Sequence, residues 1–209
     1  MLPNRLFAIM TRILAICALA SAPNGLGGGG TAAAEAQASL EKIEREVARD
    51  YPAIAHVAPV ELEAQLAHAA GDVLLIDARG AGETDVSRLP GAVPVDPDIA
   101  TDEFVTRFAE AAKGRDVVIY CSVGVRSSKL AARVRDAMVA QGARRVANLR
   151  GGIFAVHNAH RKLVDSLGET DWVHPYSWRW SRYIERRELT RYEPRSPLAG
   201  SRPGDPDGK

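Results

Sequence analysis

Cysteine is scarce in this chain: Cys17 and Cys121 are the two cysteines among 209 residues. Cys17 lies in an apolar N-terminal stretch that is typical of a secretory signal, so removal of that stretch would leave Cys121 alone. A chain with one thiol cannot form an intramolecular disulfide, although an exported protein has access to that means of stabilisation. A lone thiol in an oxidising compartment is either buried and inert or kept reactive for a purpose.

A strong charge of one sign is also absent. The chain has 27 basic and 26 acidic residues, which gives a formal net charge of +1. This balance does not indicate a nucleic-acid partner, and we expect none. Aromatic residues make up only 6% of the chain, yet all three tryptophans lie near the C-terminus. The length suits one domain with extensions, and no internal repeat is present.

A long apolar run is lacking at the N-terminus, where the pattern is that of a signal peptide. Arg5 and Arg12 precede a short apolar stretch at residues 13–19. Ala18-Leu19-Ala20 is the best cleavage site. We therefore predict a signal peptide at residues 1–22 and export to the periplasm. The alternatives are an uncleaved membrane anchor over residues 6–22 and a lipoprotein modified at Cys17, which the bulky preceding isoleucine disfavours.

Strand-like and helix-like patterns alternate after residue 55. The apolar, β-branched runs are typical of strands that are covered on both faces. This alternation predicts an α/β fold, an open parallel sheet flanked by helices on both faces. We expect strands at 56–58, 72–79, 91–95, 116–120 and 143–149, and helices at 59–71, 101–114 (capped by Thr101), 127–142 and 152–168.

The composition divides the chain into segments around this alternating region. We predict the signal peptide at 1–22, a Gly/Ala-rich linker at 23–34, an N-terminal helix at 35–52, the α/β domain at 53–168 and an aromatic and basic extension with a disordered end at 169–209. Trp178, Trp180 and Tyr183 of this extension either pack on the domain or form a patch for a protein partner or a membrane surface.

The segment "CSVGVR" places Cys121 directly after an apolar strand and before a helix that we expect to begin near Ser127. Ligands of open parallel sheets bind at the carboxyl ends of the strands. The helix N-terminus and Arg126 both favour an anion there, and Gly124 permits a tight turn of the loop. We therefore predict that Cys121 is a nucleophilic thiolate rather than a buried core cysteine.

Several motifs together resemble the rhodanese-like sulfurtransferases. The likeness covers residues 56–167 and rests on "LLIDAR", an acidic residue shortly after it, "LPGAVPV", "CSVGVRS" and "NLRGGIFAV". Two departures are Ser87-Arg88-Leu89, where the family usually has Gly-His-Ile, and Val156, where it often has tryptophan.

The resemblance implies a two-step transfer of sulfur. The Cys121 thiolate would take the outer sulfur of a donor such as thiosulfate as a persulfide and pass it to a thiol or cyanide acceptor, without metal or cofactor. Arg126 would bind the anionic donor. The loop backbone would hold the persulfide at Ser122, Val123, Gly124, Val125 and Ser127, with support from Asp77, Arg79 and Glu83.

Two other functions use a similar loop. Phosphatases and arsenate reductases have five residues between cysteine and arginine, whereas four intervene here, and the smaller ring favours sulfur transfer. A binding module that kept the fold without turnover is the third reading. His157 and His160 have the spacing of a metal-binding pair, but without a further ligand we expect them to serve packing or surface roles.

Overall fold

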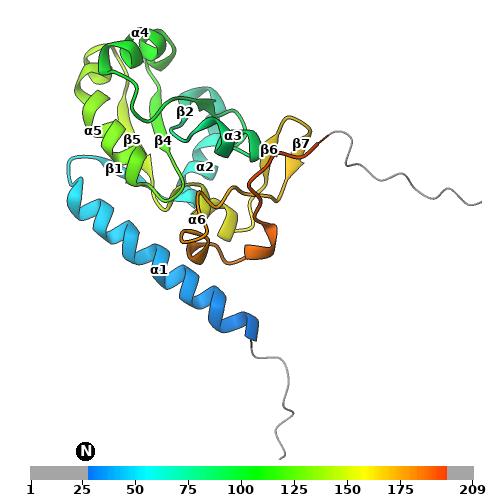
Figure 1. Ribbon diagram of the computed structural model, residues 1–209. Helices are drawn as coiled ribbons and strands as arrows, with labels where there is room; N and C mark the ends of the chain where they lie inside the picture. The colour runs from blue at the N-terminus through cyan, green and yellow to red at the C-terminus, as the bar shows by residue number, and fades with distance from the viewer. Residues whose placement is uncertain (1–27, 197–209) are drawn as a thin grey trace, which may run out of the picture.

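The apolar runs of the sequence form the strands of one parallel sheet. The computed structural model describes residues 28–196 (Figure 1). The strand order is β1-β5-β4-β2-β3, and every neighbouring pair is parallel. The predicted α/β fold is confirmed. The strands are β1 (Ala55–Val57), β2 (Val73–Asp77), β3 (Val93–Pro94), β4 (Asp116–Tyr120) and β5 (Arg145–Leu149).

Each face of the sheet carries its own hydrophobic core. Side chains alternate between the faces of a strand, so Leu75 of β2 packs in one core with Val118 of β4, and Ile76 packs in the other with Ile119. All five residues of β2 are buried. Burial on both faces explains why the sequence shows a continuous apolar run there instead of an alternating one.

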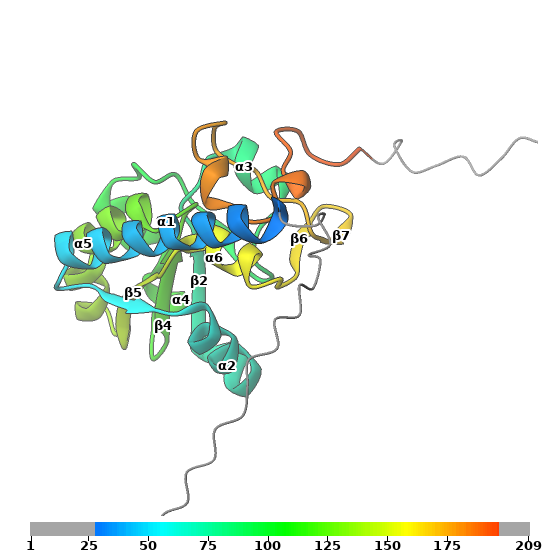
Figure 2. The same cartoon turned by 90° about the horizontal axis from the view of Figure 1, so that it is seen from below.

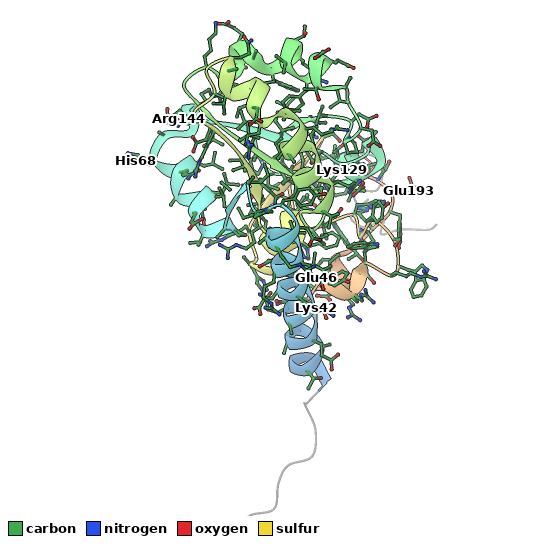
Figure 3. All side chains as sticks on the ribbon, turned by 90° about the vertical axis from the view of Figure 1, so that its left-hand side faces the viewer. Lys42, Glu46, His68, Lys129, Arg144 and Glu193 are labelled. Carbon is green, nitrogen blue, oxygen red and sulfur yellow. The ribbon has the colours of Figure 1, made fainter. Side chains whose placement is uncertain are left out.

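Helices cover both faces of the sheet. One face is covered by α4 (Thr101–Ala112) and α5 (Val125–Ala140). The other is covered by α2 (Pro59–Ala69), α6 (Gly152–Asn158) and the long helix α1 (Gly28–Asp50), which lies beside α6 in two perpendicular views (Figures 1 and 2). Figure 3, in which Lys42 and Glu46 are labelled on α1, shows the N-terminal part of this helix extending past the sheet.

Three helix starts differ from the sequence-based expectation. The helix α1 begins at Gly28, inside the segment expected to be a linker; its first three residues are glycines, and the alanines that follow them favour helix. The helix α5 begins at Val125, two residues before Ser127. The prediction that Thr101 caps α4 is wrong: Ala100 is the N-cap residue and no side chain caps the helix. Two acidic residues in the first turn of α4 complement the helix dipole there instead.

Two elements were not expected from the sequence. A short helix, α3 (Ala81–Val86), lies in the segment that we read as a polar loop. The expected helix over 152–168 ends at Asn158, and an antiparallel hairpin of β6 (Leu163–Asp165) and β7 (Gly168–Thr170) follows it. The backbone of Arg88 exchanges two hydrogen bonds with that of Val164, of 2.8 and 2.9 Å. This long-range pairing stabilises a strand where the local pattern predicts helix.

The C-terminal segment, residues 171–196, packs against the domain. Val173, Tyr183 and Ile184 belong to the core that α1 and α6 cover. The side chain of Asn158 binds this segment twice, because its amide donates to the carbonyl of Tyr183 (2.9 Å) and its oxygen accepts from the N–H of Glu185 (3.0 Å). The segment contains two 3₁₀ turns, η2 (Ser181–Tyr183) and η3 (Arg187–Leu189).

Two expectations fall outside the described residues. The predicted signal peptide lies before residue 28, and the predicted disordered end lies largely after residue 196. Among the helices of residues 28–196, none has both the length and the apolar character that are needed to cross a membrane.

Candidate active site

Cys121 lies at the carboxyl end of β4, at the N-terminal end of α5. Its sulfur accepts a hydrogen bond from the backbone N–H of Gly124 (3.2 Å), and the hydroxyl oxygen of Ser127 lies 3.4 Å from it. The start of the 16-residue helix α5 adds the positive end of a helix dipole, which favours a thiolate or a persulfide anion at this point. The residue is only 1% exposed.

Gly124 gives the loop its shape. Its φ angle of 100° is in the left-handed region, which residues with a side chain rarely adopt. A Cβ atom at this position would lie 3.1 Å from the side-chain nitrogen of Asn148. Glycine therefore allows both the turn and the close approach of the loop to β5.

The glycine pair at the start of α6 allows that helix to lie against the cysteine loop. Gly152 has a φ of 56°, and a Cβ atom there would overlap the carbonyl of Cys121 and lie 2.7 Å from the carbonyl carbon of Ser122. Without that atom, the first turn of α6 donates two backbone hydrogen bonds to the loop, from Ile153 to the oxygen of Cys121 (2.9 Å) and from Phe154 to that of Ser122 (3.1 Å). These bonds fix the loop backbone.

Arg126 is bound to Glu83 of α3. The two side chains form a bidentate ion pair with both N···O distances at 2.8 Å. The hydroxyl of Ser122 donates to Glu83 (2.8 Å) and accepts from Arg126 (2.9 Å). Burial raises the pKa of Glu83, but the hydrogen bond and charge of Arg126 outweigh it, so the pKa lies below its usual value. The guanidinium that we expected to bind an anionic donor is thus already paired with a carboxylate.

Asp77 and Arg79 form a second pair, which is fully buried. Arg79 donates to both carboxylate oxygens of Asp77 (2.8 and 2.7 Å) and to the carbonyl of Ser87 (2.6 Å). The hydroxyl of Tyr120 donates to Asp77 (2.7 Å) and accepts from the N–H of Leu89 (3.0 Å). Because Tyr120 directly precedes the cysteine, this network fixes the end of β4, and the carboxylate of Asp77 accepts bonds from both Arg79 and Tyr120.

A chain of hydrogen bonds leads away from the sulfur to β1. The hydroxyl of Ser127 donates to Asn148 Oδ1 (2.6 Å), Asn148 Nδ2 lies 3.1 Å from His56 Nδ1, and His56 Nε2 lies 3.3 Å from the carbonyl of Tyr51. A carbonyl only accepts, so Nε2 carries the histidine proton and Nδ1 accepts from Asn148. Asn148 therefore donates to His56 and accepts from Ser127. Because the Ser127 proton is used in that bond, a thiol at Cys121 can donate to the Ser127 oxygen.

Sequence reasoning did not find Asn148 or His56 as site residues. Asn148 is a buried polar residue in the apolar strand β5, and such residues bind specific partners. A polar residue inside an apolar run is therefore the feature of the sequence that could have indicated Asn148. No comparable local signal exists for His56, which reaches the site only because β1 pairs with β5.

The C-terminal segment closes the site. A cavity of about 100 Å³ is lined by Cys121, Ser122, Val123, Val125, Arg126, Tyr176 and Trp180. The guanidinium carbon of Arg126 lies 4.8 Å from the ring centre of Tyr176, whose ring contacts Trp180 edge to face at 6.0 Å. These two aromatic residues line the cavity on the side that the C-terminal segment supplies. We had expected Trp180 either to pack on the domain or to form part of a surface patch, and we had not singled out Tyr176.

The remaining candidate residues lie away from the cysteine loop. Trp178 is 73% exposed, whereas Tyr183 is buried. His157 is buried and its Nε2 bonds the carbonyl of Asp171 (3.0 Å); burial lowers its pKa to about 4. His160 is exposed. Within residues 28–196, no three metal-ligating side chains gather in a way that would hold a metal ion.

Known proteins share this domain. The family described as "Rhodanese-like domain" matches residues 59–159. A protein of Allochromatium vinosum named "Sulfurtransferase" is 40% identical over 84 residues, which are 40% of this chain and 71% of that protein. This chain belongs to the rhodanese-like family. Its similarity to that relative supports an enzyme of the sulfurtransferase type.

Other relatives of this rhodanese-like protein are longer than the chain itself. A "tRNA uridine(34) hydroxylase" of Rhodococcus erythropolis is 36% identical over 103 residues, which are 47% of this chain but only 34% of that protein. Among solved structures, the thiosulfate sulfurtransferase of Pseudomonas aeruginosa is similar with a TM-score of 0.45 and 23% identity, over 74% of this chain and 27% of that one.

Proposed function

We propose that the protein transfers sulfane sulfur through a persulfide on Cys121. In the first step the thiolate attacks the outer sulfur of a donor. With thiosulfate, the new S–S bond forms as the S–S bond of the donor breaks, and sulfite leaves with the electron pair. In the second step a thiolate or cyanide attacks the outer sulfur of the persulfide, and the Cys121 thiolate is restored.

The position of the cysteine sulfur carries this proposal. It lies at the N-terminal end of α5 and accepts the Gly124 N–H bond, so a negative charge there is stabilised before any donor arrives. A thiolate held in this way needs no separate base. Asp77, the carboxylate on the neighbouring strand, already accepts bonds from Arg79 and Tyr120 and serves as support.

The same geometry disfavours a phosphatase or arsenate reductase. The arginine of the loop is paired with Glu83, and a tetrahedral oxyanion bound beside it would meet a carboxylate of like charge. The four-residue ring also offers fewer N–H groups than such an oxyanion requires. A binding module without turnover does not need a buried, hydrogen-bonded nucleophile, so the intact Cys121 site supports catalysis.

The test is the mass of the purified protein after a sulfur donor and then after cyanide. We expect the mass to rise by one sulfur atom on Cys121 and then to return to its first value. Cys121→Ser should take up no sulfur, while Cys17→Ser, the matched control in the full chain, should behave as the wild type. Sulfur uptake by the Cys121→Ser variant would refute the proposal, as would aryl phosphate hydrolysis by a wild type that forms no persulfide.

We also propose that the protein acts outside the cytoplasm. The support is the signal-like sequence at residues 1–22. N-terminal sequencing of the protein from its native host should start near Ser21, and an intact N-terminus on a cytoplasmic protein would contradict this location.

A further inference from the structure

The roof of the active site comes from outside the matched family domain. That domain ends at residue 159, whereas Tyr176 and Trp180 line the cavity over Cys121 from the C-terminal segment. The cavity holds about 100 Å³, well below the ~300–1,000 Å³ of typical small-molecule pockets. Only a few atoms of a donor therefore fit beside the sulfur.

The two aromatic residues are held in place by several independent contacts. Trp180 packs on Tyr183, with 5.4 Å between the ring centres, and the carbonyl of Tyr183 is bound by Asn158. Tyr176 has a φ of 64°, in the left-handed region, and its N–H donates to His174 Nδ1 (2.9 Å). A bulky residue keeps this conformation only where its surroundings enforce it, and such strain is concentrated at functional sites.

The charge of the cavity is already balanced. Arg126 is the one charged residue among those that line it, and Glu83 neutralises it through two hydrogen bonds. The other faces are formed mainly by Val123, Val125 and the two aromatic rings. A dianion such as thiosulfate would have to displace Glu83 or remain unpaired in this apolar space, which is unfavourable.

We infer that Tyr176 and Trp180 determine donor specificity and select a sulfur donor whose reacting sulfurs sit on a slender, uncharged carbon arm. This inference rests on the proposed sulfur transfer. An unbranched alkyl hydropersulfide, R–S–SH, has that shape. The Cys121 thiolate attacks its outer sulfur, the S–S bond of the donor breaks, and R–S⁻ leaves with the electron pair. The product, Cys121–S–SH, keeps the proton of the donor.

The experiment compares three donors: propyl hydropersulfide, tert-butyl hydropersulfide and thiosulfate. In the wild type, kcat/KM should be highest for the propyl compound, by about tenfold or more over each of the others. In Tyr176→Gly and in Tyr176→Gly/Trp180→Leu, the preference should fall by about tenfold because the roof is gone. Glycine suits the positive φ of residue 176, so the single variant is expected to fold, and thermal unfolding checks this.

Trp178→Ala is the matched control, because Trp178 belongs to the same segment, is largely exposed and does not line the cavity. It should keep the wild-type preference. Equal kcat/KM values for the three donors in the wild type would overturn the inference, as would an unchanged preference in folded Tyr176→Gly. Both results still show sulfur on Cys121, whereas a failure of the proposed function is seen separately, as the absence of sulfur uptake from every donor.

Discussion

Replacing Gly152 by alanine tests whether close packing of α6 against the cysteine loop shapes the active site. The new Cβ atom would overlap the carbonyl of Cys121 and come within 2.7 Å of the carbonyl carbon of Ser122, while φ is 56°. A left-handed conformation costs a residue with a side chain roughly 1–2 kcal/mol. An added methyl group in a packed interior costs about 1–3 kcal/mol more. We therefore expect the free energy of unfolding to fall by about 2–5 kcal/mol.

Gly114→Ala is the matched control for the backbone contribution. Gly114 has a φ of 68°, and no atom lies within 4 Å of the site where its Cβ would be placed. Its replacement should therefore cost only the conformational part, roughly 1–2 kcal/mol. Urea unfolding measures both variants, and their midpoints are directly comparable if the slopes agree.

Sulfur uptake by the two variants provides the functional comparison. Because the overlap falls on the carbonyls of residues 121 and 122, the loop must move, and a displacement of about 1 Å at a catalytic group can reduce the rate about 100-fold. Gly114→Ala should retain the wild-type rate. Equal losses of stability in the two variants, or an unchanged rate of sulfur uptake in Gly152→Ala, would refute the packing argument.

Three further predictions concern Arg126, Asn148 and His157. Arg126→Ala leaves the Glu83 carboxylate without its charged partner, so the free energy of unfolding should fall by about 1.5–3 kcal/mol. Adding Glu83→Gln should restore part of the lost stability in urea unfolding. No recovery in the double variant would contradict the pairing. Asn148→Leu removes the acceptor that orients the Ser127 hydroxyl beside the sulfur. Persulfide formation should then slow about tenfold in single-turnover mixing. An unchanged rate constant would show that this chain of hydrogen bonds is unimportant for the reaction. Burial lowers the pKa of His157 to about 4. Between about pH 6.5 and pH 4 the unfolded state therefore binds more protons than the folded state, and the free energy of unfolding should fall by about 3 kcal/mol as the pH is lowered through this range. His157→Gln should lack this part of the pH dependence.

The sequence by itself determined the parallel sheet. Residues 73–76 of β2 and 117–120 of β4 are continuous apolar runs because both faces of these strands are buried, and this pattern is readable without any knowledge of the fold. The cysteine loop was predictable for a similar reason. Cys121, Gly124 and the start of α5 are close in the chain, so their order alone places the sulfur at a helix N-terminus.

Only the tertiary structure decided what surrounds that sulfur. Arg126 is paired because α3 brings Glu83 to it, His56 reaches Asn148 because β1 pairs with β5, and Tyr176 covers the site because the C-terminal segment packs on α1 and α6. The hairpin after α6 likewise depends on its pairing with residue 88. Local patterns report backbone preference and burial, whereas contacts between distant segments depend on strand order and on which surfaces the folded elements leave to be covered.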